Sequence, residues 1–156
     1  HGVLFRKEEQ EIRKKMIEAD LLEAVIGIGP NLFFNATMEA CIYICRSNKP
    51  VERRNKIMFI NAVKEVTRRN GESFLEVHHI QKIVDAYNGF VDIENFCSVV
   101  DIAQIEKNEY NLNVSLYAHI NSVERQILDI ETAISEWNVQ HSMVMQNINS
   151  LNDLIV

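Results

Sequence analysis

Two adjacent aromatic residues, Phe33 and Phe34, have the clearest potential for chemistry in this sequence. They follow a Gly-Pro-Asn stretch at residues 29–31, which breaks the preceding apolar run and predicts a turn. Aromatic rings in a loop or at a strand edge can stack on a nucleic-acid base. The same two rings can instead pack into the core, and the residues alone favour core packing over stacking.

Two further patterns lack the spacing that ligand sites need. Gly27-Ile28-Gly29-Pro30 has no third glycine and no following Lys-Ser/Thr, so we interpret it as a loop between two strands. His78 and His79 follow Glu76, but adjacent histidines on a helix point about 100° apart and do not share an ion easily. We therefore expect surface histidines near a helix start, and we predict no metal site.

The cysteines Cys41, Cys45 and Cys97 are three in number, which is not the pattern of a disulfide framework in a chain of 156 residues. Cys41 and Cys45 fall within an apolar strand pattern and have no second ligand pair, which argues against zinc. We expect all three to be buried, reduced thiols.

Basic residues concentrate between positions 46 and 69, although the whole chain carries 16 basic against 22 acidic residues and a net charge of −6. An acidic balance disfavours non-specific DNA binding by this chain alone. Contact with a phosphate backbone and a solvated turn and loop are equally good interpretations of the cluster. Its members are Arg46, Lys49, Arg53, Arg54, Lys56, Lys64, Arg68 and Arg69.

The elements that would position these residues form an α/β pattern. Apolar periodicity predicts a helix at residues 8–20, with Ile12, Met16 and Ile17 on one face, and strands at 22–28, 39–45 and 56–62, the second of them buried. One helix and three strands cannot close a doubly wound sheet. Because the sequence opens on His1 with an apolar Val-Leu-Phe run, we expect a fragment whose remaining strands lie upstream.

The middle of the chain predicts shorter elements. A charged surface loop is expected at 63–72, followed by a helix at 76–88 that Gly89 ends. The apolar face of that helix is expected to comprise Val77, Ile80, Ile83, Val84 and Tyr87. After it we expect a strand at 96–100, a helix at 102–108 capped by Asp101, and an extended or loop segment at 110–117.

The last segment has a heptad pattern that runs without a slip for more than four heptads, which is typical of a coiled coil or helix bundle. A helix of about 35 residues would be roughly 50 Å long and would project from a domain this small. An intermolecular or upstream-chain helix is favoured as its partner over an antiparallel pair within the chain, and His141 either sets the register or snorkels. The seam comprises Val123, Ile127, Ile130, Ile134, Trp137, His141, Val144, Ile148, Leu151 and Ile155.

Several stretches, taken together, resemble one family. HGVLFR, then EIRKKMIEADLLEAVIGIGPNLFFNATMEACIYICRSNKP, and later KIMFINA and HIQKIVDAYNGFVDIENFCSVVDIAQIEKNEYNLNVSLY resemble the modification (M) subunit of type I restriction-modification systems. These subunits are DNA adenine-N6 methyltransferases. The resemblance implies the C-terminal part of a Rossmann-like methyltransferase sheet at 1–62, a domain-closing segment at 63–118 and a long docking helix at 119–156.

The resemblance also carries expectations about function. The Asp-Pro-x-x-Gly-x-Gly and Asn-Pro-Pro-Phe/Tyr motifs are absent, so this chain alone should hold no S-adenosylmethionine, no catalytic residue and no activity. Phe33 matches the aromatic that stacks on the flipped adenine, with Phe34 as second choice, although Gly29-Pro30 replaces the usual Pro-Pro. The implied partners are the specificity and restriction subunits and, through their complex, DNA. The implied location is cytoplasmic, without a membrane span.

Two alternatives remain open at this point. Another adenine methyltransferase, such as a fused restriction-methylation enzyme, would show a contiguous recognition domain after residue 156. A non-enzymatic assembly module, in which the heptad helix is the whole purpose, would show no methyltransferase motif upstream of His1.

Overall fold

The computed structural model describes residues 2–33, 37–119, 137, 138 and 141. The chain forms two compact units, residues 1–120 and residues 121–156. Phe34 and eight of the ten predicted seam residues lie outside the described residues, so the long heptad helix stays a prediction. Within the described part, no helix is long and apolar enough to cross a bilayer.

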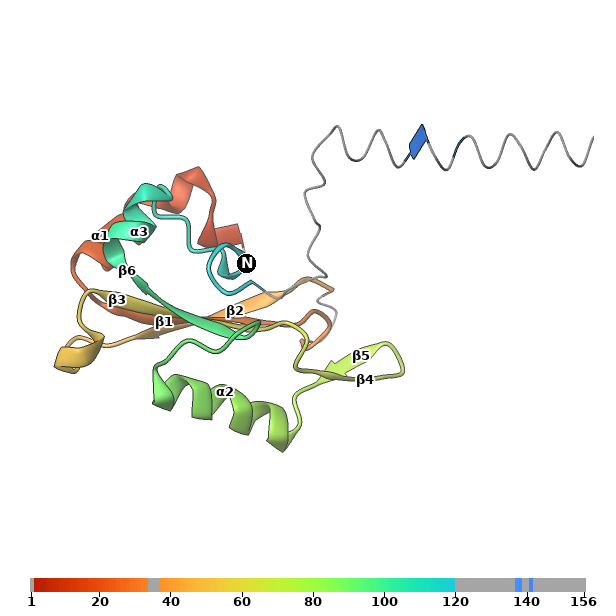
Figure 1. Cartoon of the computed structure of the whole chain (residues 1–156). Coiled ribbons are helices and arrows are strands. Elements are labelled where there is room, and N and C mark those ends of the chain that lie inside the picture. The colour runs from red at the N-terminus through yellow and green to blue at the C-terminus, as the bar shows by residue number, and fades with distance from the viewer. Residues whose placement is uncertain (1, 34–36, 120–136, 139–140, 142–156) are drawn as a thin grey trace, which may run out of the picture. The chain divides into compact units, whose positions relative to one another are not determined.

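The first unit is built on a four-stranded sheet in the order β2-β1-β3-β6 (Figure 1). Its strands are β1 (Leu22–Ile28), β2 (Ala40–Cys45), β3 (Lys56–Ala62) and β6 (Cys97–Asp101). The two central strands, β1 and β3, are parallel, and each is antiparallel to its outer neighbour. This mixed sheet confirms the expected α/β class and the predicted strands. It also includes β6, which lies in the segment expected to close the domain.

One face of the sheet is covered by the N-terminal segment and the end of the first unit (Figure 1). Helix α1 (Gln10–Glu18) and helix α3 (Ile102–Lys107) lie on this face, with short 3-10 turns at Gly2–Leu4 and Val114–Leu116. Phe59 is buried at the centre, and its ring stacks on Tyr117 with centroids 4.2 Å apart. The segment 110–117, expected as extended or loop, therefore contributes buried residues to this core.

The other face is covered by α2 (Val77–Gly89), which confirms a helix here (Figure 1). Its predicted apolar face is confirmed only in part, because Ile83 and Tyr87 pack against the core while Ile80 and Val84 are exposed. Val77 is 82% exposed, whereas His79 and Ala86 are buried. His79 turns inward because its Nδ1 accepts the backbone N–H of Glu76 in a capping box. The prediction of two surface histidines is thus wrong for His79. The helix runs through Gly89 and ends at Phe90, which is left-handed with φ 48°.

A β-hairpin replaces the predicted surface loop after β3. Strands β4 (Thr67–Arg69) and β5 (Glu72–Phe74) pair antiparallel across the two-residue turn Asn70-Gly71. Both turn residues have positive φ, 52° and 84°, as a type I′ hairpin turn requires.

The predicted burial is wrong for strand β2, for two of the cysteines and for Ile12 on the apolar face of α1. Strand β2 is a half-exposed edge strand, so Cys45 is exposed and Cys41 only partly buried, while Cys97 alone is buried. All three are free thiols. In α1, Ile12 is 62% exposed and Arg13 is buried. Arg13 turns inward because its guanidinium donates to the carbonyls of Val3, Arg6 and Tyr110.

Two smaller predictions are adjusted. Asp101 occupies the N-cap position of α3, but its side chain makes no capping hydrogen bond. A 3-10 turn at Lys7–Glu9 precedes α1, so the predicted helix begins two residues later than expected as an α-helix. A further 3-10 turn spans Val51–Arg53 between β2 and β3.

Candidate functional site

The carboxyl ends of β1 and β3 lie side by side, with Ile28 opposite Ala62. The turns that follow the two strands lie against each other. A Cβ added to Gly29 would be only 2.6 Å from the carbonyl oxygen of Val63. Asn31 adopts a left-handed φ of 60°, which reverses the chain after Pro30. The two parallel strands therefore end at one tightly packed edge.

The β4–β5 hairpin is attached to this edge. The backbone N–H of Ser73 donates to the carbonyl of Asn31 over 2.9 Å. Leu32 then packs against the core on the α2 side of the sheet. Phe33 comes next and is 58% exposed. Leu32 thus fixes the segment from inside while the neighbouring ring of Phe33 faces solvent.

Asn61 ties the end of the first unit to the same edge. Its side chain is buried, and its Nδ2 donates to the carbonyl of Ala118 over 3.0 Å. Its backbone N–H donates to the carbonyl of Phe96 over 2.8 Å. The strand end is consequently held by two segments distant in the sequence.

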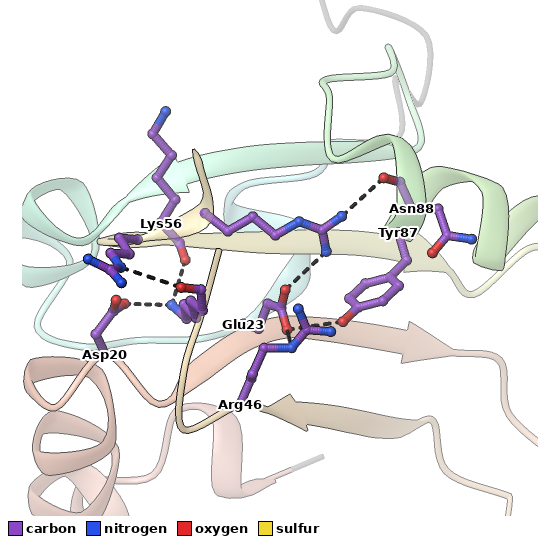
Figure 2. Close-up of polar contacts among 9 residues, drawn as sticks. Asp20, Glu23, Arg46, Lys56, Tyr87 and Asn88 are labelled. Atoms are coloured by element: carbon purple, nitrogen blue, oxygen red, sulfur yellow. Dashed lines mark hydrogen bonds and ion pairs between the residues drawn. The ribbon is translucent and has the colours of Figure 1, made fainter. Parts of the chain in front are cut away.

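Part of the basic cluster pairs with the carboxylates of Glu23 and Asp20 near the opposite end of β1 (Figure 2). Glu23 has no exposed surface, and it pairs with Arg46 and with Arg53, each over 3.0 Å. Lys49 is buried and pairs with Asp20 over 2.6 Å. A buried charge requires such partners. For Lys49 and Arg53, internal ion pairing therefore replaces both the phosphate and the solvated interpretations, whereas Arg46 pairs with Glu23 and is still 43% exposed.

Arg53 also connects this cluster to the end of α2 (Figure 2). It donates to the carbonyl of Asn88 over 3.0 Å, and its guanidinium carbon lies 4.5 Å from the ring centroid of Phe90. The Tyr87 hydroxyl donates to Glu23 Oε2 over 3.0 Å. Burial, and then the hydrogen bond to Glu23, raise the pKa of Tyr87. Glu23 was not among the residues predicted to form a site, although a carboxylate inside the apolar run of β1 indicates a buried partner.

Of the three basic residues of the cluster near the Phe33 edge, one forms an ion pair with a carboxylate and two are exposed. Arg69 pairs with Glu76 over 2.6 Å. Lys64, in the turn after β3, and Arg68, in β4, are both exposed. The local positive charge at this edge is therefore carried by these two side chains.

The described residues offer no clustered ligands for a metal ion. They contain no group of three or more His, Cys, Asp and Glu side chains that could hold a metal ion. Gly29 is explained by its close approach to the Val63 backbone, and not by an opening for a ligand.

Of the predicted seam residues, only Trp137 and His141 are described. Both are helical and exposed, and their rings stack with centroids 5.0 Å apart. That contact is typical of side chains four residues apart on one helix face. The other eight seam residues and Phe34 lie outside the described part.

The sequence matches the N-6 DNA Methylase family over residues 1–126. It is 43% identical to the type I restriction enzyme MjaVII methylase subunit of Methanocaldococcus jannaschii over 87% of this chain. It is 30% identical to the MpnII methylase subunit of Mycoplasma pneumoniae over 83%. The chain covers 24% of each of these two relatives.

Two solved structures are similar to this chain. A type I restriction-modification methyltransferase subunit from Streptococcus thermophilus has a TM-score of 0.71 and 34% identity over 76% of this chain and 25% of its own. A chain from a study of complex assembly and conformational transition in a type I system has a TM-score of 0.57 over 99% of this chain and 34% of its own. At 14% identity, the second likeness supports the fold alone.

Proposed function

The chain belongs to the N-6 DNA Methylase family, and from that premise we propose that it is the C-terminal part of a type I modification subunit. The whole protein would transfer a methyl group from S-adenosylmethionine to N6 of adenine in DNA. The similarity to methylase subunits supports this assignment. We expect it to act on DNA in the cytoplasm.

The exposure of Phe33 is the observation that carries the proposal. Its ring is 58% exposed and follows the turn at the carboxyl end of β1, beside the end of the parallel strand β3. Ligands of open α/β sheets bind beyond the carboxyl ends of parallel strands. A ring held there can stack on an adenine that has been flipped out of the duplex, an interaction of about 1–3 kcal/mol per base.

The role of this chain in the reaction would be positioning. Gly29 packs against Val63, Ser73 anchors Asn31, and Leu32 is held in the core, so the segment that carries Phe33 is fixed on three sides. A fixed ring would orient the target base at little entropic cost. The Asp-Pro-x-x-Gly-x-Gly and Asn-Pro-Pro-Phe/Tyr motifs do not occur in the sequence, and we therefore propose that the chain alone is inactive.

The heptad segment would serve assembly. Ten positions from Val123 to Ile155 follow one seam, nine of them apolar, and such a seam requires a second helix. The specificity subunit of the same complex is the proposed partner, with the restriction subunit joining the complete enzyme. Delegating sequence recognition to a partner also agrees with the net charge of −6.

A methylation assay tests the proposal. The full-length protein that contains this chain, purified with its specificity subunit, should transfer tritium from labelled S-adenosylmethionine to unmethylated DNA. Nucleoside analysis should then find the label in N6-methyladenine. The 156-residue chain alone should incorporate none. Label in cytosine, or no transfer by the full-length protein, would overturn the assignment.

A further inference from the structure

We propose that Arg68, on the β4–β5 hairpin, binds a DNA phosphate that flanks the base stacked on Phe33. The inference rests on the proposed function and adds a backbone contact to it. The hairpin lies next to the Phe33 segment because Ser73 donates to the Asn31 carbonyl, two residues before the aromatic ring.

The strand register places Arg68 on the face of the hairpin that it shares with Ser73. Arg68 and Ser73 are directly opposite in the antiparallel pair, and opposite residues project from the same face. Ser73 is buried, whereas the longer Arg68 side chain is exposed. The guanidinium therefore extends into solvent from a hairpin whose outer edge, at Ser73, is hydrogen-bonded to the turn after β1.

The charge environment distinguishes Arg68 from its neighbour. Arg69 projects from the other face, where Glu72 is its cross-strand partner, and it forms an ion pair with Glu76 over 2.6 Å. The register gives Arg68 an uncharged partner, Ser73. When no carboxylate lies opposite an arginine, the guanidinium N–H groups can bind an external anion. Two oxygens of a phosphate fit two of these N–H groups at once.

The hairpin that carries Arg68 is held by its own strand pairing and by its bond to the turn after β1. Its two-residue turn, Asn70-Gly71, has positive φ at both positions, and β5 is bonded both to β4 and to the Asn31 carbonyl. Lys64 adds a second exposed cation after β3. A phosphate contact here would fix the strand on one side of the flipped base without reading its sequence.

The salt dependence of methylation tests this contact. The complete enzyme and its Arg68→Ala, Arg68→Lys and Arg69→Ala variants would be assayed for kcat/KM on long unmethylated duplex DNA at increasing NaCl. Each phosphate contact contributes about 0.9 to the slope of log affinity against log salt. Arg68→Ala should flatten the slope by about that amount. Arg68→Lys, which keeps the charge, and Arg69→Ala, whose guanidinium is engaged by Glu76, should retain the parent slope.

The slope does not depend on the fraction of active protein, so partial misfolding of a variant does not affect the result. A slope for Arg68→Ala equal to that of the parent, with normal methylation by the parent, would overturn the phosphate contact and leave the proposed function intact. Failure of the parent to methylate adenine in any DNA would instead overturn the proposed function and the contact with it.

Discussion

The guanidinium of Arg53 donates to Oε1 of Glu23 over 3.0 Å, although Glu23 has no exposed surface at all. Arg53 comes from the 3-10 turn between β2 and β3, and Glu23 from the central strand β1. Through Asn88 and Tyr87, the same pair reaches the end of α2. The pair therefore joins the sheet to the helix that covers it.

Removal of the Glu23 carboxylate should destabilise the fold strongly. Glu23→Ala leaves the mostly buried Arg53 without a counter-ion, and breaking a buried ion pair from one side costs about 3–5 kcal/mol. We expect a loss near the lower limit because Arg46 is 43% exposed and can be hydrated. Urea unfolding measures the change. Glu52→Ala, an exposed neighbour in the same 3-10 turn as Arg53, is the control and should change stability by less than about 0.5 kcal/mol. Equal effects would contradict the pairing.

Gly29→Ala should disturb the edge that carries Phe33. The new Cβ would lie 2.6 Å from the Val63 carbonyl and 3.1 Å from Val66, so backbone must move. Overpacking of this kind costs about 1–3 kcal/mol. Gly27→Ala, two residues earlier and inside β1, is the matched control, because its Cβ would meet Val114 at 3.5 Å, an ordinary contact. Thermal unfolding of both variants measures the difference, and indistinguishable melting temperatures would contradict the close approach.

Tyr43→Phe should leave stability unchanged or raise it by up to about 1 kcal/mol at neutral pH. The Tyr43 hydroxyl is buried and has no hydrogen-bond partner among the described residues, so its removal loses no bond. A loss larger than 1 kcal/mol in urea unfolding at pH 7 would reveal a partner for the hydroxyl.

The same variant tests a pH dependence. Burial, and then the charge of Cys41, raise the pKa of Tyr43. The folded chain therefore holds the phenol proton more tightly than the unfolded chain, whose tyrosines titrate near pH 10. The contribution of the protonated Tyr43 phenol to the free energy of unfolding is therefore fully present below about pH 10 and is lost as the pH rises above it. Urea unfolding at pH 8 and pH 11 should show a smaller drop for Tyr43→Phe than for the parent.

The central strands were predictable because burial on both faces leaves a continuous apolar run. Residues 22–28 and 56–62 match the observed strands to the residue. The hairpin was not predicted because Thr67-Arg68-Arg69 has no alternation of apolar and polar residues. A hydrogen bond from the Ser73 backbone to the Asn31 carbonyl helps to hold it in place. The Asn70-Gly71 dipeptide, a strong hairpin indicator, was the available clue.

Burial of charged and polar side chains was the least predictable part of the site. Arg13 and His79 can be buried because backbone groups form hydrogen bonds with their side chains. The Arg13 guanidinium donates to the carbonyls of Val3 and Tyr110. The His79 ring accepts the backbone N–H of Glu76. The partners of Arg13 include Tyr110, which only the tertiary fold brings close. The partner of His79 depends on the capping geometry at the start of α2. The exposure of Phe33, against the core packing that the residues alone favoured, likewise depends on Leu32 filling the core position.

Phe33→Ala in the full-length enzyme should separate activity from stability. Loss of a stacking interaction of about 1–3 kcal/mol corresponds to a decrease in kcat/KM of roughly 5- to 150-fold. Because the ring is 58% exposed, the free energy of unfolding should change by no more than about 0.5 kcal/mol. Phe33→Trp should retain most activity, and Met38→Ala, at an exposed position near the same turn, should retain all of it. A loss of stability that matches the loss of activity would indicate a packing role.

Disruption of the predicted heptad seam should abolish assembly and leave the first unit folded. Ile134→Asp with Ile148→Asp would place two charges in the seam, two heptads apart, where a partner helix would have to bury them. Ser135→Asp with Asn147→Asp adds the same charge just outside the seam and should be tolerated. Co-purification with the specificity subunit measures assembly, and urea unfolding reports the first unit, which is a separate compact unit. Parent-level co-purification of the seam variant would exclude docking through this seam, since two buried aspartates oppose association far more than their exposed counterparts.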